Sequence, residues 1–396
     1  MKKLLLILLC LPMIGFGQFT YVPDDNFEAY LEANGMGNGI PNDDYVTTSS
    51  IDTAGGLYVS NQNISDLTGI EDFISIANLQ CNNNQLTTLD LSNNTALSYI
   101  QCWDNQLTML DLSQNLLLDF LFCQNNQIAT LDFSNNTALY YLQCNNNQLT
   151  TLDLSNNTAL TYFYPFSNQI TSLDVSNNPA LTYLYCWQNQ LTSIDVSNNP
   201  ALLDLRLDYN NLTSLDVSAC ISLTHLDFYD SQLTSIDLSQ NFNLIELRCG
   251  INSLTSLDLS QNISLELLYC QGNDLISLDL SNNTNLDTLV CGGNQLTILD
   301  LRNGNNPALT DFHTTSNPNL VCIDVDDVAW SAANWTNIDN WTFFSADCNP
   351  SSIKEYTAKK ELLKVTDLLG RETKQVNQPL FYIYDDGTVE KRIVIE

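Results

Sequence analysis

The chain has 396 residues and a formal net charge of −32, which arises from 45 acidic residues against 13 lysines and arginines. Between residues 18 and 350 no lysine occurs, and the only arginines are Arg206, Arg248 and Arg302. Such an acidic surface repels phosphate groups and anionic lipid headgroups, which argues against nucleic acid as a partner. Cations, neutral glycans and proteins with basic patches remain as partner classes.

Residues 1–17 have the pattern of a secretory signal peptide. Two lysines precede an apolar run, Leu4–Ile14, and the small residues Gly15 and Gly17 follow it. The run is too short to remain as a membrane span, and no other segment is long and apolar enough to form one. The sequence therefore predicts export, with no membrane span in the mature chain.

Residues 18–56 precede the repeats and are predicted to form an N-terminal cap. Asp24 or Asp25 is placed to cap a short helix that contains Phe27 and Leu31, and Gly35 is placed to end it. The apolar side of this helix is expected to cover the first turn of the repeat region.

A 21-residue pattern, L-x-x-L-x-C-x-x-N-Q-L-T-x-L-D-L-S-x-N, occurs eleven times without a slip. The leucine two positions before the cysteine is Leu79 in the first copy and Leu289 in the last. A 22-residue turn with Leu57 precedes them, and a further turn with Phe312 follows. A period of this length built on leucines predicts a leucine-rich-repeat solenoid over residues 57–325, because one turn cannot bury its apolar side alone.

Each repeat contains two similar halves, and each half is typical of a short strand followed by a turn. Two apolar residues at positions i and i+2 point inward, so the fold class is a β-dominated solenoid with parallel strands from both half-repeats. Asn, Asp, Ser and Thr fill the connections, which favours little helix. The nested pattern is similar to the 21-residue repeats of bacterial leucine-rich-repeat proteins of the internalin-like or adhesin-like kind.

Some residues recur at the same position in every or nearly every repeat and so form columns, to which we assign structural roles. Eight cysteines share one inward column and are expected to be packed free thiols, while Cys322 and Cys348 flank the non-repeating end and are the predicted disulfide. Two columns of asparagines are expected to bond to the backbone of the turns. Cys220 replaces an asparagine in one of them.

Eleven aspartates, from Asp90 to Asp300, form a column of like charges. At a strand spacing of about 4.8 Å, neighbours repel each other by roughly 0.9 kcal/mol in water before screening. The favoured explanation is that flanking Ser and Thr hydroxyls hydrogen-bond to carboxyls with raised pKa values. The alternative is calcium bridging, for example at Asp153, Asp174 and Asp195.

The outward positions of the first half-repeat vary, and there the sequence predicts a ligand-binding surface. We call its aromatic members the aromatic surface: Tyr99, Trp103, Phe120, Phe122, Tyr141, Tyr162, Tyr164, Phe166, Tyr183, Tyr185, Trp187 and Tyr229. A soluble protein seldom exposes so much contiguous apolar area without a use. The competing interpretation is a ladder that stabilises the sheet. Pro165 inside this surface is expected to remove one ladder bond.

Beyond the aromatic surface the same columns become charged. Arg206 and Arg248 are included among the candidate ligand-binding residues, and with Asp227 they alternate in one column, which predicts stacked ion pairs. The nearby carboxylates offer no defined acid and base pair, so no catalytic residue, cofactor or enzyme activity is predicted.

Residues 326–350 are predicted to form a C-terminal cap in which aromatic side chains close the end of the solenoid. The candidates are Trp330, Trp335, Trp341, Phe343 and Phe344.

Residues 351–396 differ in composition, with eight basic and eight acidic residues. The motif Asp367-Leu368-Leu369-Gly370-Arg371-Glu372, a Tyr382-Ile383-Tyr384 strand, the turn Asp386-Gly387 and a terminal Lys391-Arg392-Ile393-Val394-Ile395 strand follow in order. This order resembles the C-terminal type IX sorting domain of Bacteroidota. The resemblance implies recognition by the type IX secretion machinery, export across both membranes, and release or anchoring at the surface.

Together these features predict a secreted or surface-attached binding protein whose variable outward face binds a protein partner. A polysaccharide-binding surface protein and a passive surface coat are the alternatives.

Overall fold

The computed structural model describes residues 18–348, 362–366, 371–373, 379–384 and 389–393. The chain divides into two compact units, one that ends at Ala346 and one that begins at Asp347. The predicted signal peptide, residues 1–17, lies outside the described residues.

The N-terminal cap contains two short helices and an antiparallel strand pair. Their bounds are β1 Phe19–Tyr21, α1 Asp25–Ala33, β2 Tyr45–Thr47 and α2 Thr48–Ile51. The Asp24 carboxylate accepts hydrogen bonds from the backbone N–H groups of Asn26 and Phe27, which confirms the predicted helix start. The same carboxylate accepts from the backbone and hydroxyl of Ser65 and so joins the cap to the first turn. Phe27 and Leu31 are fully buried.

One strand from each first half-repeat joins a parallel sheet of thirteen strands. Leu79 pairs with Ile100, Ile100 with Leu121, and the register continues at 21-residue spacing as far as Leu289. The strands are β3 Gly56–Tyr58, β4 Asn78–Gln80, β5 Tyr99–Gln101, β6 Phe120–Phe122, β7 Tyr141–Gln143, β8 Tyr162–Tyr164, β9 Tyr183–Tyr185, β10 Asp204–Arg206, β11 His225–Asp227, β12 Glu246–Arg248, β13 Leu267–Tyr269, β15 Thr288–Val290 and β17 Asp311–His313.

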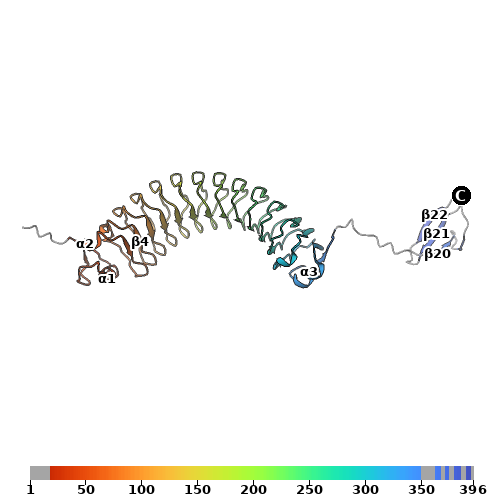
Figure 1. Ribbon diagram of the computed structural model, residues 1–396, viewed down its shortest axis with the longest axis horizontal. Coiled ribbons are helices and arrows are strands. Elements are labelled where there is room, and N and C mark those ends of the chain that lie inside the picture. The colour runs from red at the N-terminus through yellow and green to blue at the C-terminus, as the bar shows by residue number, and fades with distance from the viewer. Residues whose placement is uncertain (1–17, 349–361, 367–370, 374–378, 385–388, 394–396) are drawn as a thin grey trace, which may run out of the picture. The chain divides into compact units, whose positions relative to one another are not determined.

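The second half-repeats form a sheet only near the C-terminal end of the solenoid. This sheet contains β14 Ser277–Asp279, β16 Ile298–Leu301, β18 Cys322–Val325 and β19 Phe343–Ser345. In the other described turns the second half-repeat makes one isolated bridge, between Asp174 and Asp195. The first unit is an arc whose inner edge carries the long sheet, so successive turns diverge at its outer edge (Figure 1). Strands from both half-repeats therefore occur. Because the turns diverge at the outer edge of the arc, fewer of the second half-repeats pair with their neighbours as strands.

The core is a continuous stack of leucines and cysteines. The column cysteines are free and buried, and burial raises the pKa values of their thiols. For Cys102 the pKa rises to about 12. The protein thus packs these thiols as small apolar side chains.

Two 3₁₀ turns, η1 Ile70–Asp72 and η2 Asn306–Ala308, occur in the connections between strands.

The asparagine columns satisfy the backbone of each turn, as predicted. Asn105 donates from Nδ2 to the carbonyls of Cys81 and Cys102, and its Oδ1 accepts from the N–H of Leu86. At the equivalent position of the other column, the Cys220 thiol donates to the Val196 carbonyl over 3.6 Å. Each asparagine therefore links two neighbouring turns.

The expectation of raised pKa values in the aspartate column is wrong. The backbone N–H of the residue two positions later donates to the carboxylate, as at 2.9 Å from Ser113 to Asp111; this residue is a serine except after Asp300, where it is Arg302. This bond, followed by the serine hydroxyl, lowers the pKa of Asp111, and the same holds for Asp153. Repulsion from the neighbouring aspartate is a smaller effect because these side chains remain in solvent.

The C-terminal end of the solenoid is closed by α3 Val328–Asn334 and the side chains after it. Trp335 is buried against Phe312, with ring centroids 4.6 Å apart, and Phe344 is also buried. Trp341 and Phe343 are exposed, so the expectation that they belong to the plug is wrong. Phe343 lies in a strand next to buried Phe344, and alternation turns its side chain outward. Cys322 and Cys348 are disulfide-bonded.

The second unit contains an antiparallel sheet of three strands, β20 Leu362–Thr366, β21 Pro379–Tyr384 and β22 Val389–Ile393. Residues 367–370 and 385–388 of the sorting motif lie outside the described residues.

Candidate binding surface

The aromatic surface begins in strands β5 to β9 and continues into the residues that follow them. In each of these strands the central residue is fully buried and the two flanking residues are partly buried. All twelve aromatic members and both arginines are partly buried. The strand period therefore directs these side chains outward, where they cover one another.

Rings in the first outward column contact their neighbours in successive turns. Tyr99 and Phe120 have centroids 5.8 Å apart, Phe120 and Tyr141 6.1 Å, and Tyr141 and Tyr162 5.5 Å. Tyr162 and Tyr183 stack at 5.1 Å with an interplanar angle of 9°. The column is therefore one continuous ladder of five rings.

The second outward column extends this ladder sideways, and the third contains a separate pair of stacked rings. Phe122 contacts Tyr141 at 4.8 Å, and Tyr164 contacts Tyr185 at 4.9 Å. Phe166 and Trp187 stack at 4.2 Å with an angle of 11°. Burial raises the pKa values of the Tyr164 and Tyr185 phenols. These phenols therefore stay protonated in neutral solution and can donate hydrogen bonds.

Two predicted members stand apart from the main ladder. Within the described residues Trp103 makes no ring contact, and Tyr229 contacts Tyr209 at 5.7 Å instead. Sequence reasoning missed Tyr209, and also Tyr140, whose ring meets Phe120 and Tyr162. Both lie one residue outside the chosen columns, so they could have been found only by including every aromatic residue near the strand ends.

Pro165 locally weakens the strand pairing, as predicted. The pairing of β8 with β9 covers Tyr162 with Tyr183 and Phe163 with Leu184, whereas β9 with β10 has three residue pairs. The Pro165 carbonyl still accepts hydrogen bonds from Asn168 and Asn189. The turn is therefore held although proline lacks an N–H.

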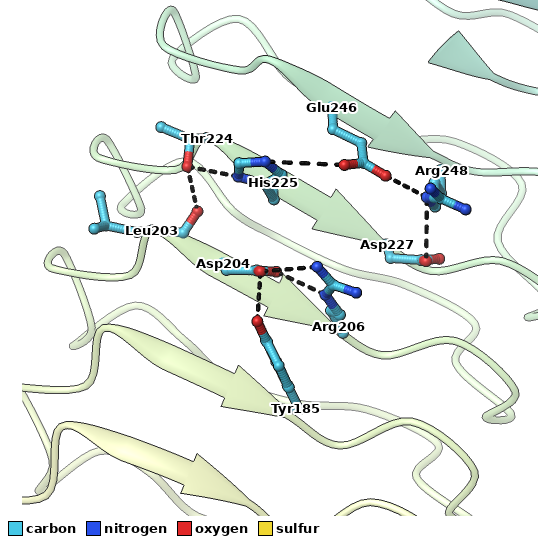
Figure 2. A network of polar contacts seen from close by, with 9 residues as sticks. All are labelled: Tyr185, Leu203, Asp204, Arg206, Thr224, His225, Asp227, Glu246 and Arg248. Carbon is cyan, nitrogen blue, oxygen red and sulfur yellow. Dashed lines mark hydrogen bonds and ion pairs between the residues drawn. The ribbon is translucent and has the colours of Figure 1, made fainter. Parts of the chain in front are cut away.

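A charged network continues the surface across β10 to β12 (Figure 2). Asp204 accepts two hydrogen bonds of 3.1 Å from Arg206 and one of 2.7 Å from the Tyr185 hydroxyl. The Arg206 guanidinium also lies 4.8 Å from the centre of the Tyr185 ring. The predicted pairing of Arg206 with Asp227 is therefore wrong, because Asp204 in the same strand is the nearer carboxylate.

Arg248 has two carboxylate partners (Figure 2). It donates to Glu246 in its own strand and lies 4.0 Å from Asp227 in β11. Its guanidinium is 4.6 Å from the centre of the Tyr269 ring, a contact that the sequence did not predict. His225 links the network to the strand edge, with Nδ1 2.9 Å from Thr224 Oγ1 and Nε2 3.8 Å from Glu246. The stacked ion pair was predicted correctly only for Arg248 and Asp227.

Two carboxyls in this network have raised pKa values. Burial raises the pKa of Asp208 to about 6 and that of Asp227 to about 7, although the two arginines oppose the change. Asp227 accepts a hydrogen bond from the Tyr229 N–H. Both groups therefore titrate near neutral pH. In the described part of the chain, no cluster of three or more His, Cys, Asp or Glu side chains is arranged to hold a metal ion.

Comparison with solved structures identifies the class of protein. The functional domain of InlJ from Listeria monocytogenes, described as including a cysteine ladder, is 30% identical, has a TM-score of 0.69, and covers 94% of this chain and 97% of its own. An internalin, inlF, from the same species is 21% identical with a TM-score of 0.67, over 83% and 96%. YopM from Yersinia enterocolitica is 25% identical with a TM-score of 0.56, over 70% and 61%.

The chain belongs to the leucine-rich-repeat proteins, and its structural neighbours are bacterial proteins of the internalin type. Its solenoid is a protein-interaction repeat scaffold. No protein-family model matches the sequence, and no curated protein does. Among the described residues, no helix has the length and apolar character needed to cross a membrane.

Proposed function

We propose that the protein binds a protein partner through the aromatic surface. The observation that carries this proposal is the continuous set of ring contacts from Tyr99 to Tyr185, with the stacked pair Phe166 and Trp187 beside it, on the inner edge of the arc. A concave, laterally extended surface is what repeat scaffolds use to bind partners. Tyrosine and tryptophan are also enriched among the few residues that dominate the binding energy of protein interfaces.

The ring geometry favours a protein over a polysaccharide. A sugar ring stacks on the free face of an aromatic side chain, but in this ladder neighbouring rings occupy many of these faces. Tyr162 and Tyr183 are nearly parallel, as are Phe166 and Trp187. Ring edges and phenol hydroxyls remain, although some hydroxyls already bond within the protein, as that of Tyr185 does to Asp204. This mixed apolar and hydrogen-bonding character matches that of a protein interface.

The test is a binding comparison between the protein and a variant that carries Tyr162→Ser and Trp187→Ser. Immobilised protein is exposed to solubilised surface proteins and, in parallel, to a glycan array. We expect saturable protein binding that weakens about tenfold or more in the double variant. A matched control with Ser172→Ala and Ser193→Ala changes two exposed serines on the outer edge and should bind normally.

Three other outcomes would contradict the proposal. Equal binding by the double variant would place the site elsewhere. Saturable binding on the glycan array alone would favour the polysaccharide alternative. The absence of any saturable ligand would favour a passive surface coat.

We further propose that residues 1–17 direct export and that residues 351–396 are recognised by the type IX secretion machinery. The support is the order of sequence motifs, together with the small three-stranded sheet that holds Tyr382 and Lys391. Deletion of residues 351–396 should leave the solenoid inside a type IX-competent cell, which fractionation would detect. Unchanged release of the truncated protein would contradict this role.

A further inference from the structure

The solenoid contains three arginines, and each has a carboxylate partner in its own repeat. Arg206 pairs with Asp204, Arg248 with Glu246, and Arg302 with Asp300. Within residues 18–348 no lysine occurs. Each of these arginines is therefore already held by a carboxylate, and Asp208 receives only the longer-range charge of Arg206 and Arg248.

Asp208 lies at the boundary between the aromatic surface and the charged network. It is partly buried, and the structure shows no hydrogen bond or ion pair from its side chain to another residue in the described solenoid. By contrast, Asp204 is held by Arg206 and Tyr185, and Asp227 by Arg248 and the Tyr229 N–H. A half-buried carboxylate without a partner is costly, so it marks a place where an added cation gains energy.

The position of Asp208 in the repeat places it in the same column as Trp187 and Tyr229. The backbone N–H of Gln188 donates to the Asp208 carbonyl, and the N–H of Tyr209 donates to the Tyr229 carbonyl. Asp208 is therefore one turn from Trp187 on one side and one turn from Tyr229 on the other. Phe166 covers one side of Trp187, the side away from Asp208 along the column.

The local charge also favours a cation. Asp204, Asp208, Asp227 and Glu246 supply four carboxylates against the two guanidinium groups of Arg206 and Arg248. The remaining negative charge lies beside aromatic rings, which attract cations through their faces. A guanidinium is planar, donates two parallel hydrogen bonds to a carboxylate and stacks on tryptophan.

We infer that Asp208, together with Trp187 and Tyr229, binds an arginine or lysine side chain of the protein partner. This inference rests on the proposed function and specifies which feature of the partner the charged end of the aromatic surface recognises: a basic residue next to apolar ones. The acidic character of the solenoid would favour the approach of such a partner.

The pKa of Asp208 gives this contact a pH dependence. Burial raises the pKa of Asp208 to about 6, and the charges of Arg206 and Arg248 lower it. The charge of Asp208 in turn raises the pKa of Asp227. A bound cation requires the ionised carboxylate, so binding should weaken as the pH falls from 7.5 to 5.5. Tyr209 and Tyr229 adjoin the site but are not the groups whose titration is invoked, and Asp230 is the exposed residue after Tyr229.

The experiment uses the full chain and a library of random dodecapeptides displayed on phage. We expect the selected peptides to combine an aromatic residue with a neighbouring arginine or lysine. A synthetic copy of a selected peptide should bind Asp208→Asn about tenfold or more weakly at pH 7.5, since charge-assisted hydrogen bonds are lost. Replacement of its arginine by citrulline should have the same effect. Asp230→Asn, which removes an equal charge from an exposed neighbour, should bind normally.

The possible failures are distinguishable. Two results would overturn the inference and keep the proposed function. The first is that the selected peptides lack basic residues. The second is that they bind Asp208→Asn as tightly as the unchanged protein but lose affinity with Tyr162→Ser and Trp187→Ser. Failure to select any peptide that depends on the aromatic surface would count against both. A circular dichroism spectrum equal to that of the parent protein would show that Asp208→Asn remains folded.

Discussion

The pKa values of individual carboxyl groups in this protein differ according to their burial and to the hydrogen-bond donors around them. Asp111 and Asp153 stand in solvent and receive hydrogen bonds from a serine two residues later, which lowers their pKa values. Asp227 is partly buried in β11, and the loss of water raises its pKa to about 7 although Arg248 lies 4.0 Å away. Identical side chains therefore contribute to stability with opposite dependence on pH.

Asp227→Asn tests the effect of this burial. The folded-state pKa of Asp227 lies above its unfolded value, so its contribution to stability is greatest below pH 4 and is lost as the pH rises toward 7. Asparagine does not ionise and so has no cost of burying a charge. The melting temperature of the variant relative to that of the parent protein should therefore increase between pH 5 and pH 8, by about 2 to 4 °C for each kcal/mol of stability. Thermal melts followed by circular dichroism at both pH values would measure this. A constant difference between the two proteins would refute it.

A chelator tests whether the aspartate column needs a metal. Because serine N–H groups already stabilise Asp153, Asp174 and Asp195 in their ionised forms, we expect EDTA to leave the melting temperature unchanged. Addition of calcium should also have no effect. A fall in melting temperature with EDTA that calcium reverses would instead support bridging of successive carboxylates.

At the scale of the turn, buried asparagines replace the hydrogen bonds that a regular strand or helix would supply. Asn157 is completely buried and donates to the carbonyls of Phe133, at 3.2 Å, and Asn136, at 2.8 Å. The next turn repeats the arrangement with Asn178. The turns are therefore held by side chains, which allows a chain with little helix to form a regular stack.

Asn157→Ala should destabilise the solenoid because it removes one of the two donors to each of the carbonyls of Phe133 and Asn136. The expected loss is about 2 kcal/mol. Asn156→Ala is the matched control: Asn156 is the preceding residue, is exposed, and makes a single bond to the Ser134 carbonyl. Urea unfolding of the two variants would compare them. Equal midpoints would show that the buried amide is not important to stability.

At the scale of the solenoid, each turn contacts only its neighbours, so the two ends need covers of their own. Trp335 provides much of the C-terminal cover: it is buried, packs against Phe312 and Phe344, and donates from Nε1 to the Leu309 carbonyl at 3.0 Å. At the other end, Asp24 joins the N-terminal helix to Ser65. Loss of either cover is expected to affect the adjacent turns first.

Trp335→Ala should loosen the last turns without unfolding the first ones. Hydrogen exchange read by mass spectrometry should become faster in β17 to β19 and stay unchanged in β4 to β8, since stability in a repeat stack is local. Trp341→Ala, at a side chain that is 49% exposed, serves as the control and should exchange like the parent protein. Uniformly faster exchange along the whole chain would mean that the solenoid unfolds as one unit.

The period, the inward columns and the position of the aromatic surface could all be predicted from the amino-acid sequence. Each of these depends on spacing along the chain: the leucines return every 21 residues, and a strand alternates its side chains, so Leu142 is buried and Tyr141 faces outward. The N-cap at Asp24 could also be predicted, since capping is local.

The interactions between these side chains could not be predicted in the same way, because they depend on the folded arrangement. Arg206 pairs with Asp204 rather than Asp227, the aspartate column has lowered rather than raised pKa values, and Trp341 is exposed while Trp335 is buried. The extent of the second sheet also depends on the curvature of the arc. These outcomes depend on side-chain rotamers, on water access and on the distance between turns. A repeat pattern fixes which residues are neighbours, but not which of several nearby partners a flexible charged side chain contacts.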